Sequence, residues 1–452
     1  MTGRKLLVPA YLLACLLLGG STQSMWFNAL LQLAAIGIMA WAAIVGLREP
    51  LPDSARRLFW LAAAMVLLVL LHLIPVPFGL WSALPGRGMV REGLAILGLA
   101  PGWQTLSLAP YDTIAAALLL LPPLAMLAGI FVLRAYTRSG IAIALLIGAT
   151  LGLALGVLQV SSPEATQAQF YLQSEVNGGT PSGFFANPNH MATLLLITLP
   201  FLAALRGSGS EERARHKRHA RLLLCGAGMT VVVIGILLNR SLAGLGLLLP
   251  VGVASVLMLV QPPAWATKAV AGAVALGLAL FIVVLASPLN RALFQGDAVT
   301  SIATRREFLA TSLAAAREYA PVGSGIGTFQ RVYRIKEDPH SVDPTVYVNH
   351  AHDDYIELLV ETGLPGAALI LLFLAWWVSA VGAMLRSPTS DLYARAGAIA
   401  SGAVLLHSLV DFPLRNSAIS SSFAVSLALI VISRKRARGP QDLWRTRHLE
   451  IG

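Results

Sequence analysis

Charged side chains and cysteines are both scarce in this sequence. Only 12% of its 452 residues are Asp, Glu, Lys or Arg, whereas 56% are hydrophobic, and the mean hydropathy is +0.71. So few charges cannot cover the surface of a soluble globular protein, and this class is excluded. The two cysteines, Cys15 and Cys225, both lie in apolar runs, which predicts free thiols and excludes a disulfide framework.

The sequence also lacks the short segments of alternating hydrophobicity that are typical of a transmembrane barrel. Apolar runs rich in Leu, Ala, Gly and Val recur instead, each of about 20 residues, the length that a helix needs to cross a bilayer. We therefore predict an all-α polytopic membrane protein with about twelve transmembrane helices. The expected spans are residues 5–21, 25–46, 58–78, 112–133, 139–160, 187–205, 221–239, 242–260, 267–287, 364–385, 396–412 and 416–433.

Basic residues outnumber acidic residues by 33 to 22, but their placement follows the expected spans and not a nucleic-acid surface. Most of them lie in short loops and span ends on the side of the N-terminus, with clusters in SGSEERARHKRHAR (208–221) and RKRAR (434–438). The positive-inside rule assigns this side to the cytoplasm. We therefore expect membrane lipid around the spans and no nucleic-acid partner.

Three long segments between the expected spans all fall on the opposite side of the membrane. The longest precedes the tenth span, and loops of this length without a fold of their own tend to be functional. The outer segments are 79–111, 161–186 and 288–363. We divide the chain into N-terminal helices (1–182), a core (183–433) that includes the periplasmic loop 288–363, and a basic cytoplasmic tail (434–452).

Titratable side chains are densest in the segment YVNHAHDDYIELLVETGLPG (347–366), which places His350, His352, Asp353 and Asp354 within five residues. A histidine beside a carboxylate can act as a general base, although a polar loop tip next to a membrane helix explains the same residues. Two histidines with nearby aspartates also supply metal-ligand types. Their spacing matches no tight zinc pattern, so we expect no metal.

Further polar motifs fall on the same outer side. The segment GFFANPNH (183–190) has an Asn-Pro pair that starts a helix. Beyond this capping role, Asn189 and His190 are candidate hydrogen-bonding groups at the rim of an outward cavity. His407 and Asp411 either support the same cavity or simply end a helix.

Three arginines on the outer side oppose the positive-inside trend: Arg240 and the adjacent Arg305 and Arg306. Each side chain either extends to the headgroups or solvent, or binds an anionic phosphate through its guanidinium. The glycine-rich segment GSGIG (323–327) lacks the lysine of a phosphate-binding loop, so we expect a plain turn.

Taken together, these motifs resemble the O-antigen ligase and O-antigen polymerase superfamily of bacterial inner-membrane glycosyltransferases, over about residues 183–415. The ligase pattern of a histidine, ten residues and a glycine fits His352–Gly363, and the pattern of an arginine, three residues and a leucine fits Arg305–Leu309. Arg240, in NRSLAG, fits the family's arginine after a span only approximately. The residue after the histidine, often Asn, Ser or Gln, is Asp353 here.

The resemblance implies a glycosyltransferase C-like fold that acts at the periplasmic face of the bacterial inner membrane, in lipopolysaccharide or polysaccharide biosynthesis. The donor would be a glycan on undecaprenyl diphosphate, and the acceptor a hydroxyl of lipid A-core or of a growing polysaccharide. Direct attack would invert the anomeric centre without a metal or other cofactor. The implied roles are His352 as the base, Asp353 or Asp354 as its orienting carboxylate, Arg240 and Arg305 as diphosphate ligands with Arg306 as a third candidate, and Asn189 and His350 as further substrate-binding residues.

Within this superfamily the sequence leaves ligase, polymerase and protein glycosylation open. A secondary transporter of the inner membrane is the alternative from a different class, because twelve spans with a central basic loop also describe such carriers. Transporters tend to place ionisable groups near the membrane midplane. Here the histidines and charged residues fall near span ends or in loops, which favours the enzyme.

The distribution of basic residues predicts the topology. A reporter that is active only in the periplasm should be active when fused after Pro339 and inactive when fused after Arg213, because these positions lie on opposite sides of the expected spans. The reverse pattern would move the proposed site to the cytoplasm.

Overall fold

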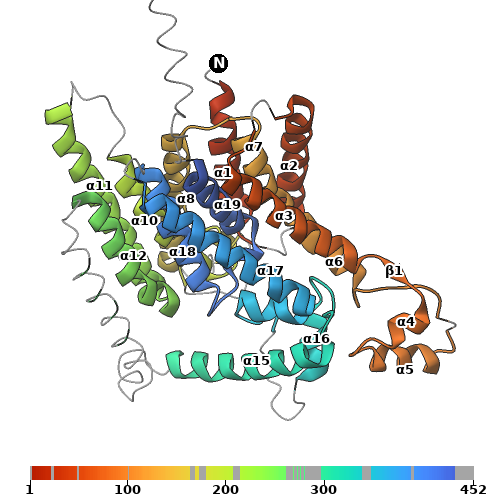
Figure 1. The fold of residues 1–452 in the computed structure, drawn as a ribbon. Coiled ribbons are helices and arrows are strands. Elements are labelled where there is room, and N and C mark those ends of the chain that lie inside the picture. Colours follow the sequence, from red (N-terminus) through yellow and green to blue (C-terminus); the bar gives the residue numbers. More distant parts are fainter. Residues whose placement is uncertain are drawn as a thin grey trace, which may run out of the picture.

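The computed structural model describes most of the chain, and the described part is almost entirely helical (Figure 1). The described residues are 3–21, 25–47, 50–99, 101–162, 168–172, 180–206, 214–260, 297–337, 348–387 and 391–432, with isolated positions between 268 and 279.

In chain order, the described elements fall into two parts. The first part contains η1 Gly3–Leu6, α1 Leu7–Leu18, α2 Met25–Val45, α3 Asp53–His72, β1 Pro75–Val76, α4 Phe78–Ser82, α5 Gly88–Ile96, β2 Gln104–Thr105, α6 Pro110–Leu118, α7 Leu121–Phe131, α8 Arg138–Ser161 and η2 Ala168–Phe170. The second part contains α10 Pro188–Leu205, α11 Ala214–Asn239, α12 Leu242–Val260, α15 Asp297–Tyr319, α16 Phe329–Lys336, α17 Asp354–Leu385, α18 Leu392–His407, η4 Pro413–Arg415 and α19 Ser417–Ile432.

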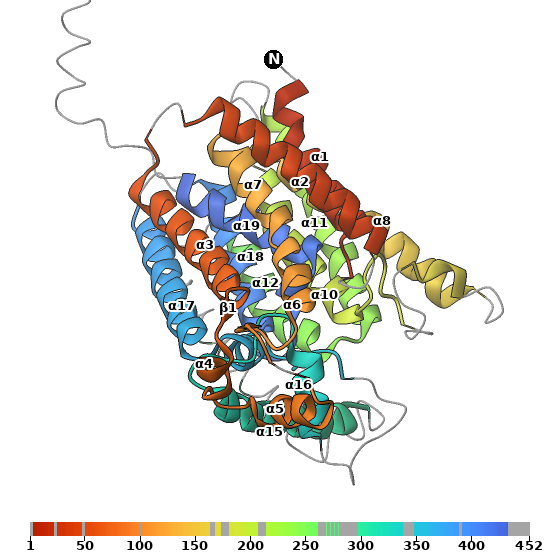
Figure 2. The same cartoon turned by 90° about the vertical axis from the view of Figure 1, so that its right-hand side faces the viewer.

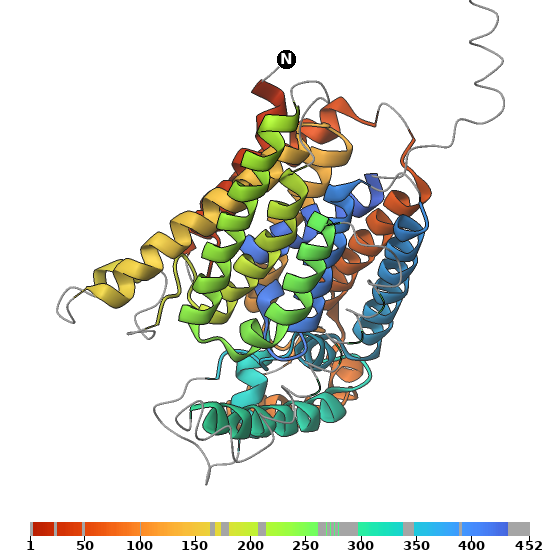
Figure 3. The ribbon, with the colours of Figure 1, turned by 90° about the vertical axis from the view of Figure 1, so that its left-hand side faces the viewer.

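Helix α10 is the most enclosed part of the bundle, because every residue from His190 to Ala204 is buried. It packs against α8, α11, α12 and α18 (Figure 3). Helices α18 and α19 pack closely on each other through small residues, as membrane helices often do. The hydroxyls of Ser422 and Ser426 each donate to a carbonyl one turn earlier, at 2.8 Å, so these buried polar groups are satisfied within α19.

Eight helices among the described residues are long and apolar enough to cross a membrane, which confirms the all-α polytopic class. They correspond to expected spans two to eight and ten. The first, eleventh and twelfth spans are the shorter helices α1, α18 and α19. The ninth, 267–287, lies outside the described residues apart from isolated positions. The count of twelve therefore stays a prediction.

One expected span boundary is wrong. The third span was expected at 58–78, but α3 ends at His72, and Pro75–Val76 then pairs antiparallel with Gln104–Thr105. The tenth span, expected at 364–385, is the part of α17 beyond a break at Gly363, and Asp353 caps the part before it. Helices α3 and α17 lie side by side (Figure 2), and the first turns of α17 carry acidic residues to the end of the bundle.

Helix α17 is interrupted at Gly363, whose φ of 60° and ψ of −147° are not helical. The N–H of Leu364 donates to the carbonyl of Pro321 at 2.8 Å, and a Cβ on Gly363 would lie only 2.1 Å from that oxygen. The N–H of Gly325 donates to the carbonyl of Glu361, also at 2.8 Å. The segment 323–327 is therefore a turn packed against the break in α17, as the sequence predicted.

One end of the bundle gathers α4, α5, α15 and α16 (Figures 1 and 2). Arg87, only 1% exposed, joins the α4–α5 segment to this end, because its guanidinium donates to the carbonyls of Gly323, Leu106 and Pro85 at 2.7–3.1 Å. Burial lowers the pKa of Arg87 to about 10, although the nearby Tyr319 counteracts this shift. No carboxylate is needed here, since the carbonyl oxygens accept the hydrogen bonds.

We predict that Arg87→Met weakens this attachment. The substitution leaves buried carbonyls unpaired, at a cost of roughly 1–3 kcal/mol in the free energy of unfolding. Arg91→Met is the matched control, because Arg91 is exposed on the same helix. Thermal unfolding of the protein in detergent should show a lower midpoint for the Arg87 variant only; equal midpoints would contradict the role assigned to Arg87.

Candidate functional site

The centre of the site is Asp411, which lies after α18 and is fully buried. Its Oδ1 accepts hydrogen bonds from the N–H of Phe412 at 2.8 Å and from Asn187 Nδ2 at 3.4 Å, and its Oδ2 accepts one from Asn189 Nδ2. The two asparagines stand at the start of α10, where Asn187 also caps the helix. The start of α10 and the end of α18 therefore meet at one carboxylate.

Three imidazoles surround this carboxylate. His190 Nε2 lies 3.8 Å and His352 Nδ1 lies 3.6 Å from Asp411 Oδ1. The third, His407, is also close enough to interact with the charge of Asp411. Both distances exceed that of a normal hydrogen bond but are short enough for a strong electrostatic interaction.

The hydrogen-bond network assigns the proton on His190. Asn416 Oδ1 accepts from the N–H of Ile419, so its Nδ2 is the donor and His190 Nδ1 must accept from it at 3.2 Å. A neutral His190 therefore carries its proton on Nε2, the nitrogen that faces Asp411. At 3.8 Å this N–H makes no hydrogen bond to Asp411, so His190 acts on the carboxylate electrostatically.

Asp411 is held ionised by these neighbours. Burial alone raises the pKa of its carboxyl, but His352 first, and then His190 and His407, outweigh burial and hold the pKa well below the usual range. The amide donors favour the charged form in the same way. Asp411 is therefore suited to stabilise positive charge on an imidazole and unsuited to take a proton itself.

His352 is held in an unusual backbone conformation, with φ at +52°. Its ring stacks on Phe308 of α15, with centroids 5.6 Å apart, and meets the edge of Phe412 at 5.0 Å. Because Nδ1 is turned toward Asp411, Nε2 is the nitrogen left for a substrate. The side chain is 26% exposed, so the ring is accessible from outside the protein.

Asp353 and Asp354, which we predicted from the sequence to orient His352, bind other groups. Asp353 Oδ1 accepts from the N–H groups of Tyr355 and Ile356, as the N-cap of α17. Asp354 Oδ2 accepts from the hydroxyl of Ser408 at 2.8 Å. Among the described residues, the carboxylate within 4 Å of His352 is that of Asp411. The structure thus favours Asp411, and not Asp353 or Asp354, as the group that orients this imidazole.

Next to His352 lies a second histidine–carboxylate pair. His350 Nδ1 is 2.8 Å from Glu357 Oε1, and the N–H of Ala351 donates to Glu357 Oε2 at 2.8 Å. His350 stacks on Phe412, with ring centroids 4.1 Å apart. The two histidines of the motif therefore border the same phenylalanine, each with its own carboxylate.

A cluster of buried charges lies behind the His350–Glu357 pair and the loop that carries Asp411. Arg415 donates to Glu361 Oε2 at 2.8 Å and lies 3.4 Å from Glu357 and 3.5 Å from Asp354. These acidic neighbours outweigh burial and raise the pKa of Arg415 above its ordinary value. Glu357 and Glu361 are not among the residues predicted from the sequence. The signal was there, because residues 354, 357 and 361 share one face of a helix.

The three predicted arginines do not all meet at this site. Arg305, on α15, is half-buried, and its charge interacts with His407. The side chain of Arg306 lies outside the described residues. Arg240 follows α11 with φ at +58° and lines a separate groove.

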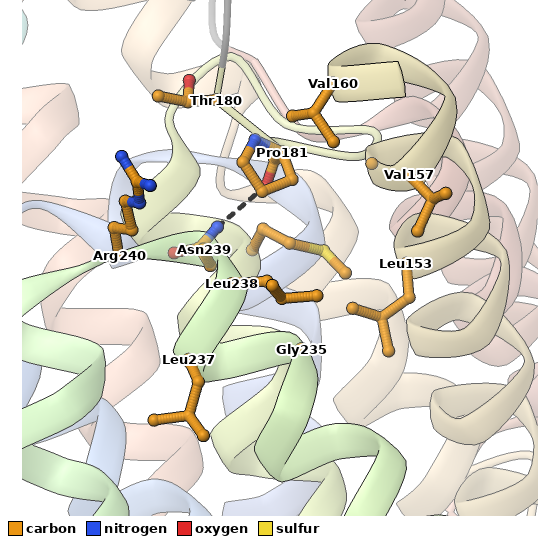
Figure 4. A pocket seen from close by; sticks show the side chains of 13 residues that line it. Leu153, Val157, Val160, Thr180, Pro181, Gly235, Leu237, Leu238, Asn239 and Arg240 are labelled. Carbon is orange, nitrogen blue, oxygen red and sulfur yellow. Dashed lines mark hydrogen bonds between the residues drawn. The ribbon is translucent and has the colours of Figure 1, made fainter.

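This groove lies between α8, α11 and the residues Thr180 and Pro181, with a volume of about 460 Å³ (Figure 4). Its lining is mainly apolar, and Figure 4 shows Arg240 and Thr180 toward one edge, away from Leu153 and Leu237. The remaining lining residues are Gly152, Gly156, Val157, Val160, Pro181, Met191, Gly235, Leu238 and Asn239. Met191, which follows His190 in α10, is the lining residue nearest in sequence to the Asp411 site.

No group of three His, Cys, Asp or Glu side chains with the arrangement of a metal site occurs among the residues that the structure describes. The His350–Asp354 segment instead divides its side chains between Glu357, Asp411, Ser408 and the cap of α17.

Comparison with known proteins identifies one family. No curated protein matches the chain. Residues 227–371, from within α11 to the middle of α17, match the family model of the O-antigen ligase. This stretch contains Arg240, Arg305 and His352, and the match confirms the resemblance of the chain to the O-antigen ligase and polymerase superfamily.

Proposed function

We propose that this protein transfers a glycan from undecaprenyl diphosphate to a hydroxyl acceptor at the periplasmic face of the bacterial inner membrane. The observation that carries the proposal is the arrangement of His352 and Asp411. An imidazole beside a buried ionised carboxylate, at one end of a bundle of apolar helices, is suited to activate a hydroxyl group. The O-antigen ligase match supports glycan transfer as the reaction class.

In the proposed reaction His352 Nε2 removes the proton from the acceptor hydroxyl. The oxygen attacks the anomeric carbon of the donor as the bond to the diphosphate breaks, which inverts that centre. The imidazolium that forms is stabilised by Asp411, whose own hydrogen bonds from Asn187, Asn189 and Phe412 keep it ionised. The acceptor is the hydroxyl of lipid A-core or of a growing polysaccharide.

Guanidinium groups replace a metal ion at the diphosphate in this proposal. Arg305 interacts electrostatically with His407, which also interacts with Asp411, and in this proposal its charge favours the departing diphosphate. Arg240 lies at the edge of the apolar groove, an arrangement suited to a lipid whose chain occupies the groove and whose charged head lies at the rim.

A transporter is less consistent with this geometry. The titratable residues of the site lie in loops: Asp411 follows α18, and His350 and His352 precede α17. Arg415 and its acidic partners lie at the same end of the bundle. A carrier generally needs its ionisable groups near the membrane midplane, between two gates. The gathering of this chemistry at one end fits transfer between substrates that meet at the membrane surface.

His352→Ala should remove the base while the protein still folds and binds donor. Turnover of a synthetic polyprenyl-diphosphate glycan should fall at least about a hundredfold, since a general base typically contributes roughly 10²–10⁴-fold. Asp411→Asn should lower turnover in the same direction, because the imidazolium loses its counter-charge. Normal turnover by both variants, at equal membrane levels, would show that this chemistry is wrong.

Arg305→Ala is the comparison for these variants, because it should weaken donor binding as well as turnover. Loss of a charge-assisted contact to diphosphate costs roughly 1.5–3 kcal/mol, so KM for the donor should rise together with the loss of turnover. A His352 variant with the same rise in KM would place the imidazole at the donor and not at the acceptor.

If the groove binds the lipid chain, a bulky side chain in its lining should weaken the binding of long-chain donors selectively. Val157 lines it and is 53% exposed, so Val157→Trp should fold and yet obstruct a lipid chain. KM for a long-chain donor should rise roughly tenfold, or about 1.4 kcal/mol, and KM for a farnesyl donor much less. Val231→Trp is the control, because Val231 is 55% exposed on α11 but does not line the groove. Equal effects of both variants would exclude the groove as the chain's site.

The arginine-based mechanism predicts activity without divalent cations. Purified protein in excess chelator should turn over donor at an unchanged rate, because no step requires a bound metal. Complete loss of activity, restored by one specific metal, would instead favour His350, His352 and Asp411 as ligands.

A further inference from the structure

The His350–Glu357 pair has no role in the reaction described so far. It is the tighter of the two histidine–carboxylate pairs, with 2.8 Å between His350 Nδ1 and Glu357 Oε1, against 3.6 Å between His352 Nδ1 and Asp411 Oδ1. Glu357 is 1% exposed and holds the same turn through the N–H of Ala351. Since Nδ1 is taken by Glu357, Nε2 is the nitrogen of His350 that remains for a substrate.

Charged groups surround this pair. Asp354, Glu357 and Glu361 are all buried and all lie within 4 Å of Arg415. A buried carboxylate needs a counter-charge, and Glu357 has two cationic or ionisable groups within reach, namely Arg415 at 3.4 Å and the His350 ring at 2.8 Å. Glu357 is therefore placed to stabilise an imidazolium at His350. His190 interacts electrostatically with both His350 and His352.

The two histidines lie close to one another in space. The ring of His350 stacks on Phe412 at 4.1 Å between centroids, and the ring of His352 meets the edge of the same phenylalanine at 5.0 Å. Their carboxylates come from different elements, since Glu357 belongs to α17 and Asp411 follows α18. The site thus presents two imidazoles with opposite tasks available, one proton acceptor and one proton donor.

We propose that His350 is the general acid of the reaction and that Glu357 is its positioning residue. This inference rests on the proposed function. As the acceptor oxygen forms its bond to the anomeric carbon and gives its proton to His352 Nε2, the bond between that carbon and the diphosphate oxygen breaks. His350 Nε2–H then protonates the departing diphosphate. The proton gained by His352 and the proton lost by His350 balance, and exchange with solvent restores both rings.

The chemistry of the leaving group suits this transfer. A terminal phosphate takes up its second proton with a pKa of about 6, and an ordinary imidazole titrates near 6.5. Donor and acceptor of similar pKa exchange a proton efficiently near neutral pH. Arg305 already offsets part of the diphosphate charge, so the acid contributes on the order of tenfold, below the usual range of 10²–10⁴.

The test is the pH dependence of kcat for the full-length protein with a synthetic polyprenyl-diphosphate glycan. The wild-type profile should fall on the alkaline side as His350 loses its proton. His350→Gln should be roughly tenfold slower at neutral pH, with an unchanged KM, and should lack the alkaline fall. Glu357→Gln should move that fall to lower pH, because the imidazolium has lost its counter-charge. Tyr355→Phe is the control: it removes a hydrogen bond to the Leu405 carbonyl near the start of the same helix and should leave the profile unchanged.

The outcomes separate this inference from the function on which it rests. If His352→Ala is inactive while His350→Gln and Glu357→Gln retain the wild-type alkaline fall, His350 is not the acid and the transfer reaction stands. If both variants lose activity equally at every pH and melt at lower temperature, the pair has only a structural role and the inference is wrong. If the wild-type protein does not use a lipid-diphosphate donor, the proposed function fails, and the acid fails with it.

Discussion

The site depends on one ionic interaction at the end of the bundle, between Arg415 and the acidic face of α17. Arg415 belongs to η4, and its guanidinium reaches Asp354, Glu357 and Glu361 within 4 Å. Asp354 also accepts from Ser408 and from the N–H of Leu414, so residues 408–415 are fixed against α17 from both ends. Asp411 lies between these anchors, and Glu357 lies on the face that they hold.

The cost of burying these charges explains why they are so closely connected. A buried ion pair is favourable only when its geometry is good and its remaining hydrogen-bonding capacity is satisfied. Glu361 meets this condition through Arg415 and the N–H of Gly327, and Glu357 through Arg415, His350 and the N–H of Ala351. His350 and Ala351 are thereby held against α17. Such positioning is useful here, since a proton transfer depends on positions defined to a fraction of an ångström.

Much of this arrangement can be predicted from the sequence. Where the prediction fails, the failure has a physical reason. Apolar runs of span length predicted the helices because a bilayer requires that length. Density of titratable groups and the spacing to Gly363 indicated His352. The carboxylate that orients His352 was predicted to be a neighbour in sequence, Asp353 or Asp354. Asp353 instead caps α17, and Asp411 is brought to His352 by the packing of α10 against α18. Sequence proximity ranks candidates poorly when helix capping competes for the same side chain.

The separate environments of the two carboxylates determine what their histidines can do. Asp411 accepts hydrogen bonds from two asparagine amides and the Phe412 N–H, and His352, His190 and His407 together hold its pKa low, so it stays ionised. Glu357 instead shares one guanidinium with two other carboxylates and lies 2.8 Å from His350 Nδ1. Two chemically identical side chains, separated by one alanine, thereby face carboxylates with different surroundings. A reaction that removes a proton from one substrate and leaves charge on another can use such a difference.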